Sequence, residues 1–187
     1  LSVLADTSAT SEQKTAALGA QSKALQVSNV IVQASAAMKS GSGDTTQSSA
    51  SKAVTNAIAA NVTKSAEAGE GIDLTNTATL ISIIETAATE AGETDVAVQA
   101  SKLASIASAS NRSAEDATTI EALAKVAVVS QGDVVTAIEA AVTAGDELDT
   151  VVESYSEESL ATAVEAAEAG TIFQTKELDE GEGTDID

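Results

Sequence analysis

TSEQKTAALGAQSKALQVSNVIVQASAAMKSGSG, residues 10–43, is the stretch that decides the fold class. Thr10 stands three residues before Gln13, which is the spacing of a helix-capping box. Gly41 and Gly43 end the pattern, because Gly is the usual residue just past a helix. Between these ends, apolar side chains recur at helical spacing and charges are rare. We therefore predict a long helix that is apolar or neutral nearly all round, as a central or an intermolecular helix would be.

The same spacing and punctuation continue beyond this helix. Ser, Thr, Asp or Asn stands at each expected start, and Gly or a polar residue stands at each expected end. The further expected helices span 44–68, 73–91, 94–111, 113–131, 133–145 and 156–170, with a short helical turn over 147–155. The sequence thus predicts an all-α protein, a compact bundle of six to seven helices.

The two ends of the chain differ from this helical pattern. LSVLA (1–5) and TIFQTK (171–176) are expected to be short extended segments. ELDEGEGTDID (177–187) has the composition of an acidic linker punctuated by Gly. The predicted organisation is a helical domain over 1–176, followed by an acidic linker or tail over 177–187.

The helical region contains an internal echo. VTNAIAANVT (54–63) and VVTAIEAAVT (134–143) agree at six of ten positions. Their separation indicates two tandem helical units of about 80 residues, over 12–92 and 93–170. An Ala-rich sequence also produces such a match by chance, so the sequence leaves duplication and coincidence open.

Composition limits both the core and the chemistry. Of the 187 residues 39 are Ala, whereas Leu, Ile, Val and Phe together make up about a fifth, so we expect a thin core with closely packed helices. The chain has no His, Cys, Pro or Trp, one Tyr and one Phe. This excludes a His base, a Cys nucleophile and any Cys or His metal site. We expect no catalysis.

Charge is distributed unevenly within the net −20. Residues 1–64 hold five Lys against three carboxylates, whereas residues 65–187 hold 26 carboxylates against four cationic side chains. This argues against nucleic acid and anionic membranes as partners. No run approaches the roughly 20 apolar residues that span a bilayer. The expected partners are neighbouring domains or copies of the chain itself, stacked head to tail as a homo-oligomer or filament.

Two Gly–acid junctions, GEGID (69–73) and GDELD (145–149), suggest calcium loops at first sight. A loop of the EF-hand type needs oxygen ligands at alternate positions, which neither junction supplies. The structural interpretation explains each letter: Gly ends one helix, the apolar residue packs beside it, and Asp73 or Asp149 caps the next helix.

The acidic tail holds the candidate metal ligands. Five carboxylates within nine residues can share Ca²⁺ with an adjoining domain, because this ion prefers hard oxygen ligands. A solvated, self-repelling linker is the simpler interpretation. The candidate residues are Asp179, Glu180, Glu182, Asp185 and Asp187.

Paired carboxylates are the remaining candidates for chemistry. Glu157 with Glu158, or Glu115 with Asp116, would act as acid and base only in a pocket that raises one pKa. Such pockets are usually lined with aromatic side chains, of which this chain has only two. SEQK (11–14) has the spacing of a Ser–Lys pair, but helix capping explains it better.

LGAQSKALQVSNVIVQASAAM (18–38) and TIFQTKELDEGEGTDID (171–187) resemble the Ala-rich acidic helical domains of large secreted bacterial surface or adhesin-like proteins of marine or cyanobacterial type. The resemblance implies a helical spacer among β-sandwich or calcium-binding repeats, and transfers no functional residue. Without an initiator Met or a signal-peptide pattern, we expect a mature or excised segment. The expected function is a non-catalytic structural, assembly or spacer domain outside the cell. The alternative is a calcium-responsive or partner-binding helical adhesion module.

Overall fold

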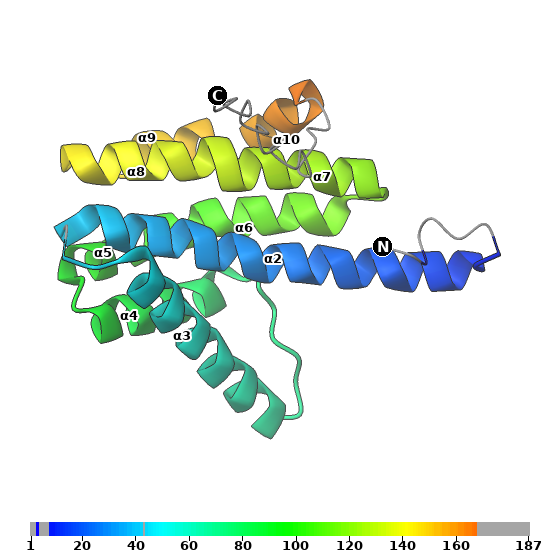
Figure 1. The fold of residues 1–187 in the computed structure, drawn as a ribbon, viewed down its shortest axis with the longest axis horizontal. Coiled ribbons are helices and arrows are strands. Elements are labelled where there is room, and N and C mark those ends of the chain that lie inside the picture. The colour runs from blue at the N-terminus through cyan, green and yellow to red at the C-terminus, as the bar shows by residue number, and fades with distance from the viewer. Residues whose placement is uncertain (1–2, 4–7, 43, 168–187) are drawn as a thin grey trace, which may run out of the picture.

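The computed structural model describes residues 3, 8–42 and 44–167, and this part of the chain has an all-α fold (Figure 1). The described helices are α2 (Ser11–Ser42), α3 (Gln47–Glu67), α4 (Thr77–Ala91), α5 (Thr94–Val98), α6 (Ala100–Asp116), α7 (Ile120–Val128), the π-helical turn η1 (Val129–Asp133), α8 (Val134–Ala144), α9 (Asp149–Ser154) and α10 (Glu157–Ala166). The predicted fold class is confirmed. The expected extended segments at 1–5 and 171–176 lie, apart from Val3, outside the described residues.

The long helix α2 is the axis of the bundle. It begins with the predicted capping box, because the Thr10 amide donates to Gln13 Oε1 at 2.9 Å and the Gln13 amide donates to Thr10 Oγ1 at 3.3 Å. It packs on α3, α6 and α8, and every residue from Gln33 to Met38 is buried. The prediction of a central helix is therefore confirmed.

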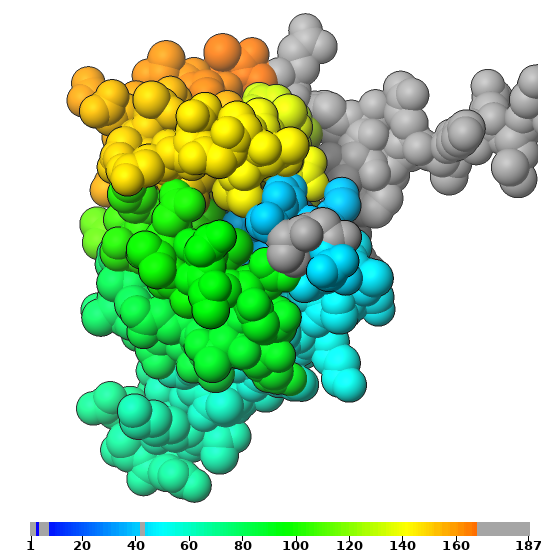
Figure 2. All heavy atoms as spheres, turned by 90° about the vertical axis from the view of Figure 1, so that its left-hand side faces the viewer, coloured from blue at the N-terminus to red at the C-terminus, as the bar shows by residue number. Residues whose placement is uncertain are grey.

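The other helices form layers on either side of α2. Seen along two directions, α3 and α4 lie on one side, α2 and α6 lie in the middle, and α7, α8 and α10 lie on the other side (Figures 1 and 2). Helix α6 contacts both outer layers, through α4 and through α10. Thus α2 and α6 together form the inner wall that joins the two halves of the molecule.

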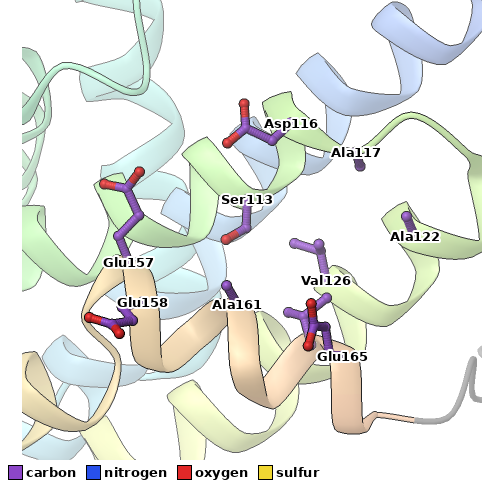
Figure 3. A pocket seen from close by; sticks show the side chains of 10 residues that line it. Ser113, Asp116, Ala117, Ala122, Val126, Glu157, Glu158, Ala161 and Glu165 are labelled. Atoms are coloured by element: carbon purple, nitrogen blue, oxygen red, sulfur yellow. The ribbon is translucent and has the colours of Figure 1, made fainter.

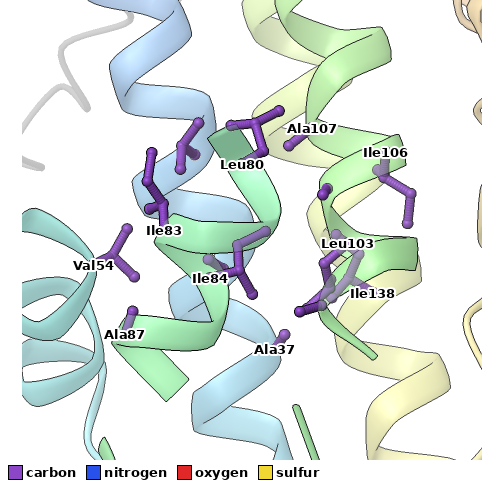
Figure 4. Close-up of a cluster of buried hydrophobic side chains, with 14 of the residues drawn as sticks. Ala37, Val54, Leu80, Ile83, Ile84, Ala87, Leu103, Ile106, Ala107 and Ile138 are labelled. Carbon is purple, nitrogen blue, oxygen red and sulfur yellow. The ribbon is translucent and has the colours of Figure 1, made fainter. Parts of the chain in front are cut away.

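The core combines few large aliphatic side chains with many Ala residues (Figure 4). Among the largest fully buried side chains are Met38, Leu80, Ile83, Ile84, Leu103, Ile106, Ile138, Leu148 and Leu160. Ala residues such as Ala37, Ala87 and Ala107 fill the positions between them. Small side chains let helix backbones approach closely, so the core is thin, as the composition predicts.

Two predicted caps in the α2–α4 region are wrong by a few residues. Thr46, not Asp44, is the N-cap of α3, and its side chain accepts the backbone N–H three residues on. Asn76, not Asp73, caps α4 in the same way. Asp73 instead accepts the Thr75 amide at 2.8 Å, which closes a turn before the helix. Thr46 and Asn76 stand nearer to the helices than Asp44 and Asp73. All four are residue types that favour the N-cap, so the sequence pattern did not distinguish between them.

The predicted boundaries at Ser113 and Asp133 are also wrong. Helix α6 continues through Ser113 to Asp116, and Thr119 caps α7 instead. Helices α7 and α8 form one continuous helix, Ile120–Ala144, in which η1 carries Gly132 and Asp133 through the predicted break. Burial of the residues that follow, on α8, outweighs the local cost of Gly in a helix.

The composite helix Ile120–Ala144 is the one helix among the described residues that is long and apolar enough, by length and composition, to cross a membrane. Its run of apolar residues is interrupted by charges in the sequence. It packs against α2, α6 and α10, and 28% of its most apolar stretch is buried inside the fold. The expectation of no membrane insertion stays a prediction.

The Gly–acid junctions end helices as predicted. Gly69, Gly92 and Gly145 have φ values of 76°, 79° and 72°, the left-handed region in which Gly ends a helix. Leu148 is fully buried beside its junction. Asp149, however, is the first residue of α9 and makes no cap; its carboxylate lies 2.8 Å from Lys102 Nζ. The junctions therefore end helices as predicted, but both predicted caps, Asp73 and Asp149, are wrong.

Candidate functional site

The carboxylates singled out in the sequence lie in different places. Asp179, Glu180, Glu182, Asp185 and Asp187 lie outside the described residues, so calcium binding by the tail stays a prediction. Within the described residues, no group of three or more Asp or Glu side chains is arranged to hold a metal ion. Melting in Ca²⁺ compared with Mg²⁺ would test the tail directly.

Three of the four carboxylates of the predicted pairs, Asp116, Glu157 and Glu158, line one surface groove, with a volume of about 590 Å³, between the end of α6, α7 and α10 (Figure 3). Its lining residues are Ser113, Asp116, Ala117, Ala122, Val126, Glu157, Glu158, Ala161, Val164 and Glu165. One carboxylate of each pair forms an ion pair with a cationic side chain. Glu115 pairs outside the groove with Lys23 at 3.2 Å, and Glu157 pairs with Arg112 at 3.5 Å.

The groove has an apolar floor and an acidic rim. Val126 is buried in the floor, and Ala side chains from all three segments surround it. The rim carboxylates, on Asp116, Glu157, Glu158 and Glu165, come from residues that are exposed to solvent. A general acid needs a carboxyl group whose pKa is raised by burial, and a solvated rim does not provide that burial. This arrangement suits the binding of a cationic group beside small apolar side chains.

A second cluster of polar residues lies inside the protein and was not predicted. We call Gln26, Asn29, Gln33, Ser108, Ser110, Asn111 and Ser130 the polar network; each is at most 5% exposed. Asn29 Nδ2 donates to Asn111 Oδ1 at 3.2 Å, and the Ser130 hydroxyl donates to Asn29 Oδ1 at 2.9 Å. Gln33 Nε2 donates to Ser110 Oγ and to the Ser130 carbonyl, both at 3.0 Å. These bonds join α2, α6 and η1.

The polar network also holds the segment that enters α4. Asn111 Nδ2 donates to the Leu74 carbonyl at 2.7 Å, and the Ser108 hydroxyl donates to the Thr75 carbonyl at 2.6 Å. Gln26 Nε2 donates to the Asn111 carbonyl at 3.2 Å. Among the described residues, Gln33 Oε1 is the one buried side-chain oxygen or nitrogen without a hydrogen-bond partner. All three layers of the bundle are thus tied together by uncharged groups that mostly satisfy one another.

Asp73, in the segment that enters α4, contributes to the stability of the fold against acid. Hydrogen bonds from the Thr75 hydroxyl and then the Thr75 amide lower the pKa of Asp73 below its ordinary value of 3.8. Because the folded-state pKa is depressed, the stabilisation is complete above the unfolded-state pKa and is lost as the pH falls through the folded-state pKa. Asp73 is exposed, so the contribution is less than about 1 kcal/mol.

We expect Asp73→Asn to flatten the acid limb of the stability profile. Urea unfolding of both proteins between about pH 5 and pH 2 should show the difference in unfolding free energy shrinking as Asp73 becomes protonated. Glu70→Gln, a change of the same charge on the same loop, is the control, because Glu70 lacks the paired Thr bonds that Asp73 accepts. If the difference in unfolding free energy between the unchanged chain and Asp73→Asn does not vary with pH, the lowered pKa of Asp73 is contradicted.

No protein-family model, curated protein or solved structure matches this chain. The groove and the polar network are therefore interpreted from their own geometry. The polar network adjoins the groove, since Asn111 lies on the same helix as Ser113 and Asp116.

Proposed function

We propose that the chain is a non-catalytic structural module, an assembly or spacer domain of an extracellular bacterial surface protein. The observation that supports this most is the polar network. Its amide and hydroxyl groups bond mainly to one another and to the backbone of neighbouring segments. They serve to fix helices in register, as polar groups in a core can do.

The way the helices pack supports a mechanical role. A helix of 32 residues, α2, forms the axis, and the two outer layers contact it or its partner α6. Ala residues at the contacts hold the helices close, while hydrogen bonds oppose sliding of α2 against α6. A force applied along α2 is therefore shared with both layers, as a spacer requires.

The surface fits an ionic extracellular medium. Of the 29 carboxylates, those in the described residues lie mostly at the surface, and the net charge is −20. Such a charge keeps the surface hydrated and the protein soluble, and salt screens the repulsion between carboxylates. The acidic-rimmed groove is the specific observation that favours a second candidate, a module that binds a partner through this surface.

Immunogold labelling of cells that carry the encoding gene tests the proposal. We expect antibodies against the folded chain to label intact cells, and an in-frame deletion of residues 10–167 to change the height or the lateral order of the surface layer. Labelling seen only after permeabilisation would contradict the extracellular location. An unchanged layer after the deletion would contradict the structural role.

A further inference from the structure

At the end of the bundle beside the groove, a small apolar cluster is only partly covered. Its buried residues are Ala114, Leu123 and Val126, and the half-buried apolar residues packed against them are Leu18, Leu25, Ala117, Ile120 and Val164. In this cluster half-buried residues outnumber buried ones, whereas the opposite holds in the main core. Val126 and Val164 also line the groove. An apolar side chain placed in the groove would remove more of this surface from water.

The chain leaves the described bundle at this groove. Helix α10 supplies Val164 and Glu165 to the groove lining and ends at Ala166. Ala167, which follows, has an extended backbone with φ −65° and ψ 131°. Residues 168–187 lie outside the described residues, but they are joined to the bundle at the edge of the groove. This tether raises their effective concentration at the groove above that of a free molecule.

The composition of this part of the chain indicates which residues suit the groove. TIFQTK (171–176) contains the one Phe of the chain, Phe173, and a cation, Lys176, but no carboxylate. Residues 177–187 contain six carboxylates and no cation. Because like charges repel, an acidic rim disfavours 177–187 and accepts 171–176.

The charges beside the groove support this choice. Arg112 lies 3.5 Å from a Glu157 carboxylate oxygen, and Lys125 Nζ donates to the backbone carbonyl of Glu165 at 3.3 Å. The four rim carboxylates still outnumber these two cations. Charge therefore excludes an acidic occupant, whereas the apolar floor and the tether favour 171–176.

The segment is long enough to lie along the groove. The part of α10 that lines it, from Glu157 to Glu165, extends for about 12 Å at about 1.5 Å per residue. A segment of six extended residues spans about 20 Å. Residues 168–170, which end in Gly170, allow the chain to reverse, because connections of roughly two to six residues commonly join packed elements.

We propose that residues 171–176 dock in the groove of their own copy, with Phe173 on the floor beside Val126. Alternate side chains of an extended segment point to opposite sides. One side of this segment carries Phe173 between two Thr residues, whereas the other carries Ile172 together with Lys176. Turning the second side to the floor would bury a cation against apolar side chains, which is costly. With Phe173 on the floor, Lys176 remains in water near the acidic rim.

This contact would fix the direction in which residues 177–187 leave the bundle, because the chain is held both by α10 and by the groove. A fixed exit suits a spacer, since force applied to that end passes into the packed helices; this consequence rests on the proposed function, whereas the contact itself does not. A segment docked here also occupies the surface that a partner-binding module would use. The contact therefore favours the spacer over the second candidate.

The reactivity of one introduced thiol tests the contact, because the chain has no Cys. Ala161 is exposed and lines the groove, so Ala161→Cys places the thiol where the segment would cover it (Figure 3). In the full chain, we expect Phe173→Ala to speed alkylation of this thiol by iodoacetamide about tenfold, since the apolar burial that holds the segment is lost. Leu178→Ala, which also removes a large apolar side chain but outside 171–176, is the matched control and should leave the rate unchanged.

Two further measurements separate covering from other effects. Ala122→Cys, on the opposite wall of the groove, should show the same dependence on Phe173. Ala60→Cys, exposed on α3, should react at one rate in all backgrounds. Far-UV circular dichroism confirms that the variants fold, and sedimentation equilibrium gives their mass.

We expect a monomer in which protection of the thiol does not depend on protein concentration. Alkylation rates unaffected by Phe173→Ala, or raised equally by Leu178→Ala, would overturn the proposal. Protection that grows with concentration together with a mass above the monomer would show that a second copy covers the groove, and would overturn it as well. None of these results changes the labelling of intact cells, which tests the proposed function separately.

Discussion

Replacing Asn111 by Ala is expected to lower the free energy of unfolding by about 2–4 kcal/mol. Asn111 Oδ1 accepts from Asn29 Nδ2, and Asn111 Nδ2 donates to the Leu74 carbonyl. The substitution leaves both partners buried without these bonds, and each unpaired buried group costs about 1–3 kcal/mol. Urea unfolding at pH 7, followed by far-UV circular dichroism, measures the loss.

A matched Asn→Ala substitution at an exposed position separates the effect of burial from the effect of residue type. Asn56 on α3 is exposed and donates its Nδ2 to Glu90 Oε1 at 2.8 Å. Asn56→Ala should change the unfolding free energy by less than about 0.5 kcal/mol, because water replaces the lost bond. Equal effects of the two substitutions would show that the buried position of Asn111 has no special role.

Leu80→Ala is expected to cost about 3–5 kcal/mol, in the upper part of the range for such changes. Leu80 is fully buried and lies in the core cluster with Ala107 and Ile83 (Figure 4). Its neighbours include many Ala residues on closely packed helices, which have no side-chain freedom with which to fill the space. The cavity therefore stays open, and the loss approaches a large share of the roughly 5–15 kcal/mol that holds a typical domain folded.

Val62→Ala is the control for this core substitution. Val62 lies on the second half of α3, is 43% exposed and packs on no core cluster of the described residues. Its truncation should change the unfolding free energy by less than about 0.5 kcal/mol, because this side chain fills no part of the core. A small effect of Leu80→Ala, comparable with that of Val62→Ala, would mean that the core adapts more than close Ala packing allows.

Local signals in the sequence predicted the parts of the fold that depend on neighbouring residues. The capping box at Thr10 and the left-handed Gly92 and Gly145 are such cases, since each acts within one helical turn. The predicted cap at Asp133 failed because distant contacts decide that region. Val134 and Ile138 are buried only if α8 continues in line with α7.

The polar network was detectable in part. Ser22, Gln26, Asn29 and Gln33 follow each other by four, three and four residues, which places neutral polar side chains on one face of the apolar α2. This spacing signals a polar seam, but it does not say what lies opposite. The partners at 108–111 and 130 are more than 70 residues away in the sequence, so their pairing depends on how the helices pack.

The position of the groove depends on tertiary packing even more than the polar network does. Asp116, Glu157 and Glu158 were recognisable as carboxylates near helix ends. That they share one rim follows from α10 packing on α6 and α7. A single sequence carries no signal for that contact, nor for the way the second half of α3 extends beyond the other described helices.

A double-mutant cycle between Asn29 and Asn111 tests most directly whether the polar network holds α2 against α6. The free energy of unfolding is measured by urea for the unchanged chain, Asn29→Ala, Asn111→Ala and the double variant, so the other bonds of each residue cancel. We predict a coupling of about 1 kcal/mol or more. Additive effects, within about 0.3 kcal/mol, would contradict the claim that this buried bond fixes the two central helices.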